Sequence, residues 1–254
     1  MSFPDPEEMV VAKSHLNFPV VGIGASAGGL GALQKLLKTL PPQPGMAFVV
    51  VMHLSPEHES SLGPILQRSG PLPVHTVTTE VPIEVDNVYV ISPALKLVMS
   101  DGKLRVSPLR TLEGRRGSID LFFRSLAQAH EERAVCVVLS GTGSDGAQGL
   151  RRVKELGGVA LAQSAEDAEF DGMPRAAVQT GFVDFILPVD EIAAKLSLLW
   201  ENASASSFPR RRPDWKWSSR KAKQSFRRRK PCSPSRRFCV SGPDTTSPTT
   251  NAAR

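Results

Sequence analysis

The stretch Val20-Val-Gly-Ile-Gly-Ala-Ser-Ala-Gly-Gly29 decides the fold expected of this chain. It lies partly within Phe18–Gly24, a segment that is apolar on both faces, as buried strands of parallel sheets are. Leucines at helical spacing follow between Gly28 and Leu40, and the pair Pro41-Pro42 ends that pattern. Because Ala47–Met52 is a second apolar run, the pattern predicts a strand–helix–strand unit with two parallel strands.

The remainder of the folded region alternates in the same way around an antiparallel insert. The insert is a predicted β-hairpin of Leu95–Ser100 and Lys103–Ser107, and Asp101-Gly102 is a typical type I′ turn. The pattern predicts a doubly wound α/β domain over residues 17–200, with a mostly parallel sheet. Further strands are predicted at Val74–Thr79, Asn87–Ile91, Ala134–Leu139, Val159–Ala162 and Val183–Leu187. Further helices are predicted at Ser118–Glu131, with Ser118 as its N-cap, and at Asp190–Trp200.

Charge is distributed unevenly along the 254 residues. Of 31 Lys and Arg, 14 lie from residue 201 onward, but only 3 of the 25 Asp and Glu lie there. Residues 201–254 are rich in Ser, Pro and Arg without periodicity, so we expect a disordered basic tail, and residues 1–16 are expected to be a flexible leader. The body between them has more acidic than basic residues, which argues against nucleic-acid binding.

Composition also limits the location and the cofactors of the protein. No apolar run is long enough to span a bilayer, and the N-terminus lacks the pattern of a signal peptide. We therefore expect a cytoplasmic protein without membrane insertion. The three cysteines show no metal-ligand spacing, and we predict neither a metal nor a cofactor.

A serine, a histidine and an aspartate follow the three clearest parallel-strand candidates. Ser26 follows the first strand, His53 follows the second directly, and Asp145 lies in the turn Gly141–Gly146 after the strand at 134–139. Ligands of open α/β sheets bind at the carboxyl ends of the strands, so we expect these side chains to meet there. A hydroxyl, an imidazole and a carboxylate are the groups that nucleophilic acyl transfer uses.

The turn around Ser26 supports this interpretation. Gly24-x-Ser26-x-Gly28 matches the G-x-S-x-G pattern, in which glycines permit a tight turn that exposes the serine hydroxyl. The helix after Ser26 would direct free backbone N–H groups toward an oxyanion. The chain order Ser…His…Asp differs from that of the α/β-hydrolases, which argues against a standard member of that fold.

Two kinds of alternative remain open from these residues. Gly22-x-Gly24-x-x-Ala27 also fits the dinucleotide fingerprint, but no acidic residue lies between Glu8 and Glu57, where a ribose-binding carboxylate is expected. Each residue also has a structural alternative: Ser26 as a turn former, His53 as a surface residue and Asp145 as a helix cap.

Four blocks of sequence are similar to those of a known family. They are Val20–Gly29, Val51–Pro56, Leu139–Ala147 and Asp171–Ala176. Together, in this order, they resemble the catalytic domain of the chemotaxis protein-glutamate methylesterases (CheB). The resemblance covers about residues 17–200 and is closest to methylesterase modules that are fused to, or encoded beside, receptor methyltransferase and sensor domains.

The resemblance implies hydrolysis of glutamate methyl esters on chemoreceptors, together with deamidation of glutamines. Ser26 falls on the family's nucleophile, His53 on its base and Asp145 on its orienting acid. The vicinity of the oxyanion and substrate would contain Ala27, Gly28, Thr142 and Met173. Classical members often have Thr where this chain has Ala27, and Met where it has Thr142.

The partners that the resemblance implies are a methyl-accepting chemoreceptor as substrate and a separate receiver, methyltransferase or histidine kinase protein. The alternative is a CheB-like module with weak or no activity that binds and regulates within a signalling complex. Only about 16 residues precede the first strand, so we expect no receiver domain within this chain.

Overall fold

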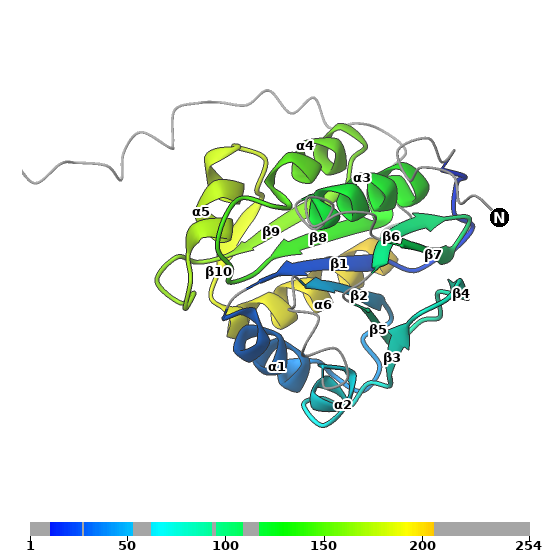
Figure 1. The fold of residues 1–254 in the computed structure, drawn as a ribbon, viewed down its shortest axis with the longest axis horizontal. Helices are drawn as coiled ribbons and strands as arrows, with labels where there is room; N and C mark the ends of the chain where they lie inside the picture. The colour runs from blue at the N-terminus through cyan, green and yellow to red at the C-terminus, as the bar shows by residue number, and fades with distance from the viewer. Residues whose placement is uncertain (1–10, 27, 53–61, 93–94, 109–116, 206–254) are drawn as a thin grey trace, which may run out of the picture. The chain divides into compact units, whose positions relative to one another are not determined.

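The computed structural model describes residues 11–26, 28–52, 62–92, 95–108 and 117–205 (Figure 1). In this described part the larger sheet has seven strands, in the order β10-β9-β8-β1-β2-β5-β3. The strands are β1 (Val20–Ala25), β2 (Ala47–Met52), β3 (Val74–Val77), β5 (Val88–Ile91), β8 (Ala134–Val138), β9 (Val159–Gln163) and β10 (Phe185–Leu187). A smaller sheet, in the order β4-β7-β6, contains β4 (Val81–Pro82), β6 (Leu95–Ser100) and β7 (Lys103–Pro108).

The larger sheet is parallel at every described pairing, and its strand order reverses at β1. From β1 the chain first builds β2, β3 and β5 on one side and later adds β8, β9 and β10 on the other. Val20 pairs with Ala47 of β2 on one side and with Ala134 of β8 on the other. The carboxyl ends of β1 and β8 thus form the topological switch point, where open α/β sheets bind their ligands.

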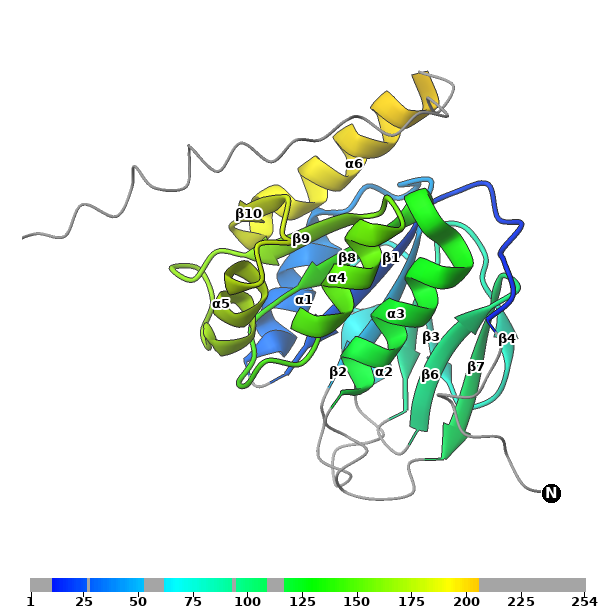
Figure 2. The same cartoon turned by 90° about the horizontal axis from the view of Figure 1, so that it is seen from above.

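Helices cover both faces of the larger sheet, and each face has its own hydrophobic core (Figures 1 and 2). One face packs against α3 (Ser118–His130), α4 (Ala147–Glu155), α5 (Gly172–Gln179) and the hairpin of β6 and β7. The other packs against α1 (Gly29–Thr39), α2 (Leu62–Gln67) and α6 (Val189–Ala205). The predicted doubly wound α/β fold with an antiparallel hairpin is therefore confirmed.

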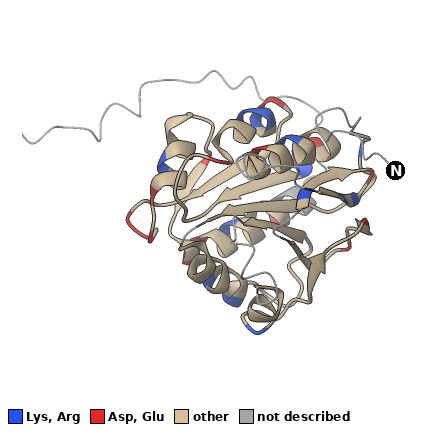
Figure 3. Ribbon diagram, in the orientation of Figure 1, with Lys and Arg blue, Asp and Glu red and all other residues tan. Residues whose placement is uncertain are grey.

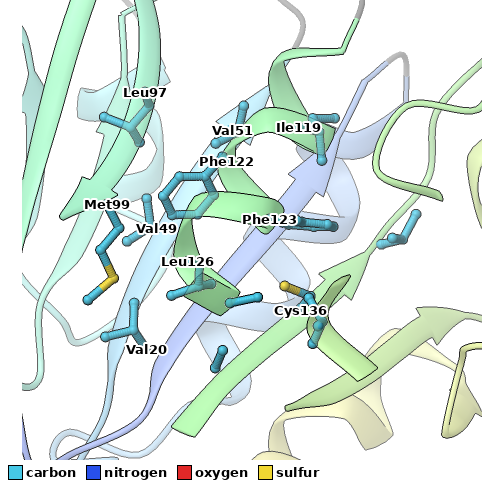
Figure 4. Close-up of a cluster of buried hydrophobic side chains, with 14 of the residues drawn as sticks. Val20, Val49, Val51, Leu97, Met99, Ile119, Phe122, Phe123, Leu126 and Cys136 are labelled. Atoms are coloured by element: carbon cyan, nitrogen blue, oxygen red, sulfur yellow. The ribbon is translucent and has the colours of Figure 1, made fainter. Parts of the chain in front are cut away.

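The helix α3 joins the larger sheet to the hairpin. Phe122 is fully buried in a cluster that contains residues of β2 and β6, and Figure 4 shows its ring between them. The hydroxyl of Ser125 accepts a hydrogen bond from the backbone N–H of Met99 in β6, at 3.0 Å. Packing of its apolar face against the larger sheet and the hairpin therefore holds α3, including its N-terminus, in place.

Several local predictions differ from the structure. The N-cap of α3 is Gly117, in the left-handed region at φ 90°, so the prediction of Ser118 as the N-cap is wrong. The helix α6 extends to Ala205, beyond its predicted end at Trp200. The hairpin turn is as predicted, since Asp101 and Gly102 both have positive φ, at 52° and 69°.

The two ends of the chain are described only in part. Residues 1–10 and 206–254 lie outside the described residues, and most of the predicted leader and tail falls there. In the part of the leader that is described, the N–H of Ser14 donates to the carbonyl of Ala129 in α3, at 2.7 Å. Among the described helices, none has the length and apolar character needed to cross a membrane.

Candidate active site

Ser26 lies directly after β1, at the switch point of the sheet. Its backbone N–H donates to the carbonyl of Ser140, beyond β8, at 3.1 Å, and its carbonyl accepts from the N–H of Gly29 at 2.9 Å. Gly28 has a φ of 70°, the left-handed conformation that glycine adopts without strain, and α1 begins at the next residue. Ser26 is 8% exposed, so it is held between two strand ends while remaining close to the surface.

Gly141 separates Ser26 from Met173, and the three residues are in close contact. A Cβ atom on Gly141 would lie 2.3 Å from Met173 Sδ and 2.9 Å from Ser26 Cβ. The N–H of Gly141 donates to the carbonyl of Phe170 at 2.9 Å, and its carbonyl accepts from the N–H of Met173 at 2.8 Å. These bonds hold the start of α5 beside Ser26, which places Met173 near the serine. Met173 itself is fully buried.

Asp145 accepts hydrogen bonds from four backbone N–H groups. Its Oδ2 accepts from Gly117 at 3.1 Å and Ile119 at 3.2 Å, and its Oδ1 accepts from Asp120 at 3.0 Å and Gly146 at 2.9 Å. Three of these donors belong to the N-terminus of α3 or its cap, whose orphan N–H groups and dipole favour a carboxylate. Asp145 therefore caps a helix, but it caps α3, more than 20 residues earlier, rather than the α4 that follows it.

A second carboxyl group, that of Asp120, lies beside Asp145. Burial, together with the charge of the neighbouring Asp145, raises the pKa of Asp120 to about 6, although the N–H of Gly149 donates to its Oδ1 and opposes that rise. Asp120 is not among the site residues predicted from the sequence. An acidic residue in the first turn of a predicted helix is common, and only the fold brings it to the glycine-rich turn after β8.

Of the remaining predicted site residues, Thr142 is described by the structure, but His53 and Ala27 are not. Thr142 is exposed on the turn after β8. His53 and Ala27 lie outside the described residues, so their predicted roles remain predictions. The strand that precedes His53 is placed, because Met52 at its end pairs with Ala25, the residue before Ser26.

The described residues contain no group of three or more His, Cys, Asp or Glu side chains arranged to hold a metal ion.

The other charged cluster near this end of the sheet is structural. Lys35 of α1 lies 2.8 Å from Asp190 of α6 and 3.5 Å from Asp167, whose carboxylate also accepts from the N–H of Val189 at 2.9 Å. This cluster joins α1 to α6 and to the segment that follows β9.

The fold and the site together define a doubly wound α/β protein with a buried serine at the switch point of a parallel sheet. The chain belongs to the CheB methylesterase family, because the model of that family matches residues 21–196. That family membership makes it an enzyme of the protein-glutamate methylesterase class, as predicted.

Similar proteins agree with this membership. A relative from Leptospira interrogans, provisionally named a protein-glutamate methylesterase/protein-glutamine glutaminase, is 33% identical over 188 residues, which are 74% of this chain and 97% of the relative. A protein-glutamate methylesterase/protein-glutamine glutaminase of Anaeromyxobacter dehalogenans is 37% identical over 70% of this chain and 52% of its own length. The crystal structure of the CheB methylesterase catalytic domain of Thermotoga maritima matches with a TM-score of 0.67 and 28% identity, over 72% of this chain and all of that domain.

Proposed function

We propose that this chain hydrolyses the methyl esters of glutamyl side chains on chemoreceptors, with Ser26 as nucleophile, His53 as general base and Asp145 as the acid that orients His53. The observation that carries the proposal is the position of Ser26. It is a serine at the switch point of a fold whose family is named for this reaction, bonded through its backbone to the turn after β8 that leads to Asp145.

The reaction proceeds in two acyl-transfer steps. The Ser26 hydroxyl attacks the ester carbonyl while His53 accepts its proton, and the proton then passes to the departing methoxide, which leaves as methanol. Water, deprotonated by His53, attacks the resulting glutamyl-enzyme ester and releases a free glutamate side chain and the Ser26 hydroxyl. With a glutamine side chain the same steps release ammonia in place of methanol.

The backbone supplies the oxyanion donors in this proposal. The N–H of Ser26 is bonded to Ser140, so the donors are assigned to the backbone around Ala27 and to the turn that carries Thr142. Each donor that points to the developing charge contributes on the order of 3 kcal/mol to the transition state. The carboxylate of Asp145 is held in place by four N–H groups, and in this proposal it orients His53 from that fixed position.

Methanol release from methylated receptor membranes tests the proposal. We expect Ser26→Ala to lower the rate at least about a thousandfold, while its thermal unfolding stays near that of the wild type. Ser144→Ala is the matched control, because Ser144 is an exposed serine in the same region. Full activity of the Ser26 variant would refute the nucleophile assignment. A wild-type protein that binds receptors without releasing methanol or ammonia would instead support a regulatory binding module.

A further inference from the structure

Phe170 is an exposed aromatic side chain on a rigidly held backbone. It lies in residues 164–171, between β9 and α5, and is 41% exposed. Its N–H donates to Ser140 Oγ at 3.0 Å, and its carbonyl accepts from the N–H of Gly141 at 2.9 Å. The carbonyl of the same Ser140 accepts from the N–H of Ser26. The position of Phe170 is thus coupled, through Ser140, to that of Ser26.

The ring of Phe170 and the carboxylate of Glu169 both lie against Gly28. A Cβ atom on Gly28 would lie 2.6 Å from Phe170 Cδ2 and 2.9 Å from Glu169 Oε2. Gly28 is only two residues beyond Ser26 and directly precedes α1. An apolar ring and a negative charge therefore stand side by side at the rim of the serine site.

The rim carries an excess of negative charge. Acidic residues follow one another along the segment before α5, at Glu166, Asp167, Glu169 and Asp171 (Figure 3). Asp171 is paired with Arg175 at 2.5 Å, and Asp167 lies 3.5 Å from Lys35. Within the described part of the chain, no cation forms an ion pair with Glu169. Its carboxylate therefore lies against Gly28 without a paired cation from the described residues.

The two side chains favour binding of a neutral ester and disfavour binding of its charged product. A glutamyl methyl ester presents methylene and methyl groups without charge, which gain free energy by covering an exposed aromatic ring. The glutamate formed by hydrolysis carries a negative charge, which a nearby carboxylate repels. Discrimination between ester and product requires both the apolar contact and the charge repulsion, because the two molecules differ only in one methyl group and one charge.

We propose that Phe170 and Glu169 determine which side chain occupies the Ser26 site, with Phe170 binding the apolar part of the ester and Glu169 expelling the carboxylate product. This inference rests on the proposed function and adds its substrate discrimination. It predicts that the two residues affect different measurable quantities. Phe170 controls the KM of the methylated receptor, and Glu169 controls inhibition by the demethylated one.

The test compares Phe170→Ala and Glu169→Gln with two matched controls. Ile186→Ala removes another exposed apolar side chain, 51% exposed, from β10. Glu132→Gln removes another exposed acid, from the turn that follows α3. Methanol release is measured over a range of methylated receptor concentrations, with and without demethylated receptor. Thermal unfolding of each variant checks that it is folded, and Phe170→Leu is a second variant that keeps an apolar group.

We expect Phe170→Ala to raise KM about tenfold, which corresponds to roughly 1.4 kcal/mol, with kcat changed less than about threefold. Phe170→Leu should fall between it and the wild type. Glu169→Gln should strengthen inhibition by the demethylated receptor about fivefold, as expected for one partly screened charge. Values within twofold of the two controls would overturn the inference while the wild type remains active. An inactive wild type would overturn the proposed function itself.

Discussion

Replacing Asp145 by Asn tests whether one carboxylate both caps α3 and serves the reaction. Each carboxylate oxygen accepts two backbone N–H groups, those of Gly117 and Ile119 at Oδ2 and those of Asp120 and Gly146 at Oδ1. Asparagine keeps one oxygen and replaces the other with a donor. Whichever way the amide turns, two backbone N–H groups lose their acceptor and face another N–H group.

The expected loss of stability follows from these bonds. Two lost bonds to a charged acceptor cost about 1.5 kcal/mol each, and the lost charge at the N-terminus of α3 costs about 0.5 kcal/mol more. Removing the charge beside Asp120 returns about 1 kcal/mol, after a discount for partial exposure of that pair. We therefore expect Asp145→Asn to lower the free energy of unfolding by about 2.5 kcal/mol. Loss of the group that is proposed to orient His53 should lower kcat about ten-thousandfold.

The assay pairs urea unfolding at pH 7.5 with methanol release, and Ser144→Ala serves as the control. The two roles of Asp145 are refuted separately. A destabilised variant with wild-type turnover would show that Asp145 is a cap and not the orienting acid. An inactive variant whose free energy of unfolding is unchanged would show that the four N–H bonds contribute no stability. Wild-type values in both measurements would refute both assignments.

Three further changes have distinct expected outcomes. Gly141→Ala forces a Cβ against Ser26 and the buried Met173, so we expect about 1–3 kcal/mol of destabilisation and a fall in kcat of at least about tenfold, measured by unfolding and methanol release. Asp120 has a raised pKa, so its ionisation destabilises the fold as pH rises through about 6. Asp120→Asn should therefore raise the free energy of unfolding by about 1 kcal/mol at pH 7.5, discounted for exposure, and leave it unchanged at pH 4. Burial lowers the pKa of His130 to about 4, below its unfolded value, so stability falls as pH drops from 6.5 to 4, by about 3 kcal/mol. His130→Gln should remove that part of the pH dependence in urea unfolding.

The larger sheet could be predicted from the sequence because its strands carry their own signal. Ala47–Met52 is apolar at every position, and the structure has β2 over those same residues, all of them buried. The helix α1 ends at Thr39, just before Pro41-Pro42, as expected where proline removes the next backbone donors. These features depend on local composition, which a single sequence displays directly.

Other features depend on contacts between distant segments and could not be predicted in the same way. The N-cap of α3 is Gly117, which has no side chain, and the acceptor of its N–H, Asp145, is 28 residues away. The sequence pattern does not predict the helix α5, because this helix is short and contains Gly172 and Pro174, which lower helix propensity. The contact of Phe170 with Gly28 likewise joins segments that are far apart in the chain.

The glycines before Ser26 have a different role from the one that the sequence pattern suggests. Gly24 is not among the residues with positive φ, so the turn does not require it. A Cβ there would lie 2.5 Å from Ile119, and one on Gly22 would lie 2.9 Å from Phe122. Both glycines therefore let α3 lie close to β1, as close approach of a helix to a strand requires. The spacing of Gly22 and Gly24, which resembles the dinucleotide fingerprint, thus allows α3 to pack closely against β1. The N–H groups at the N-terminus of α3 in turn hold Asp145.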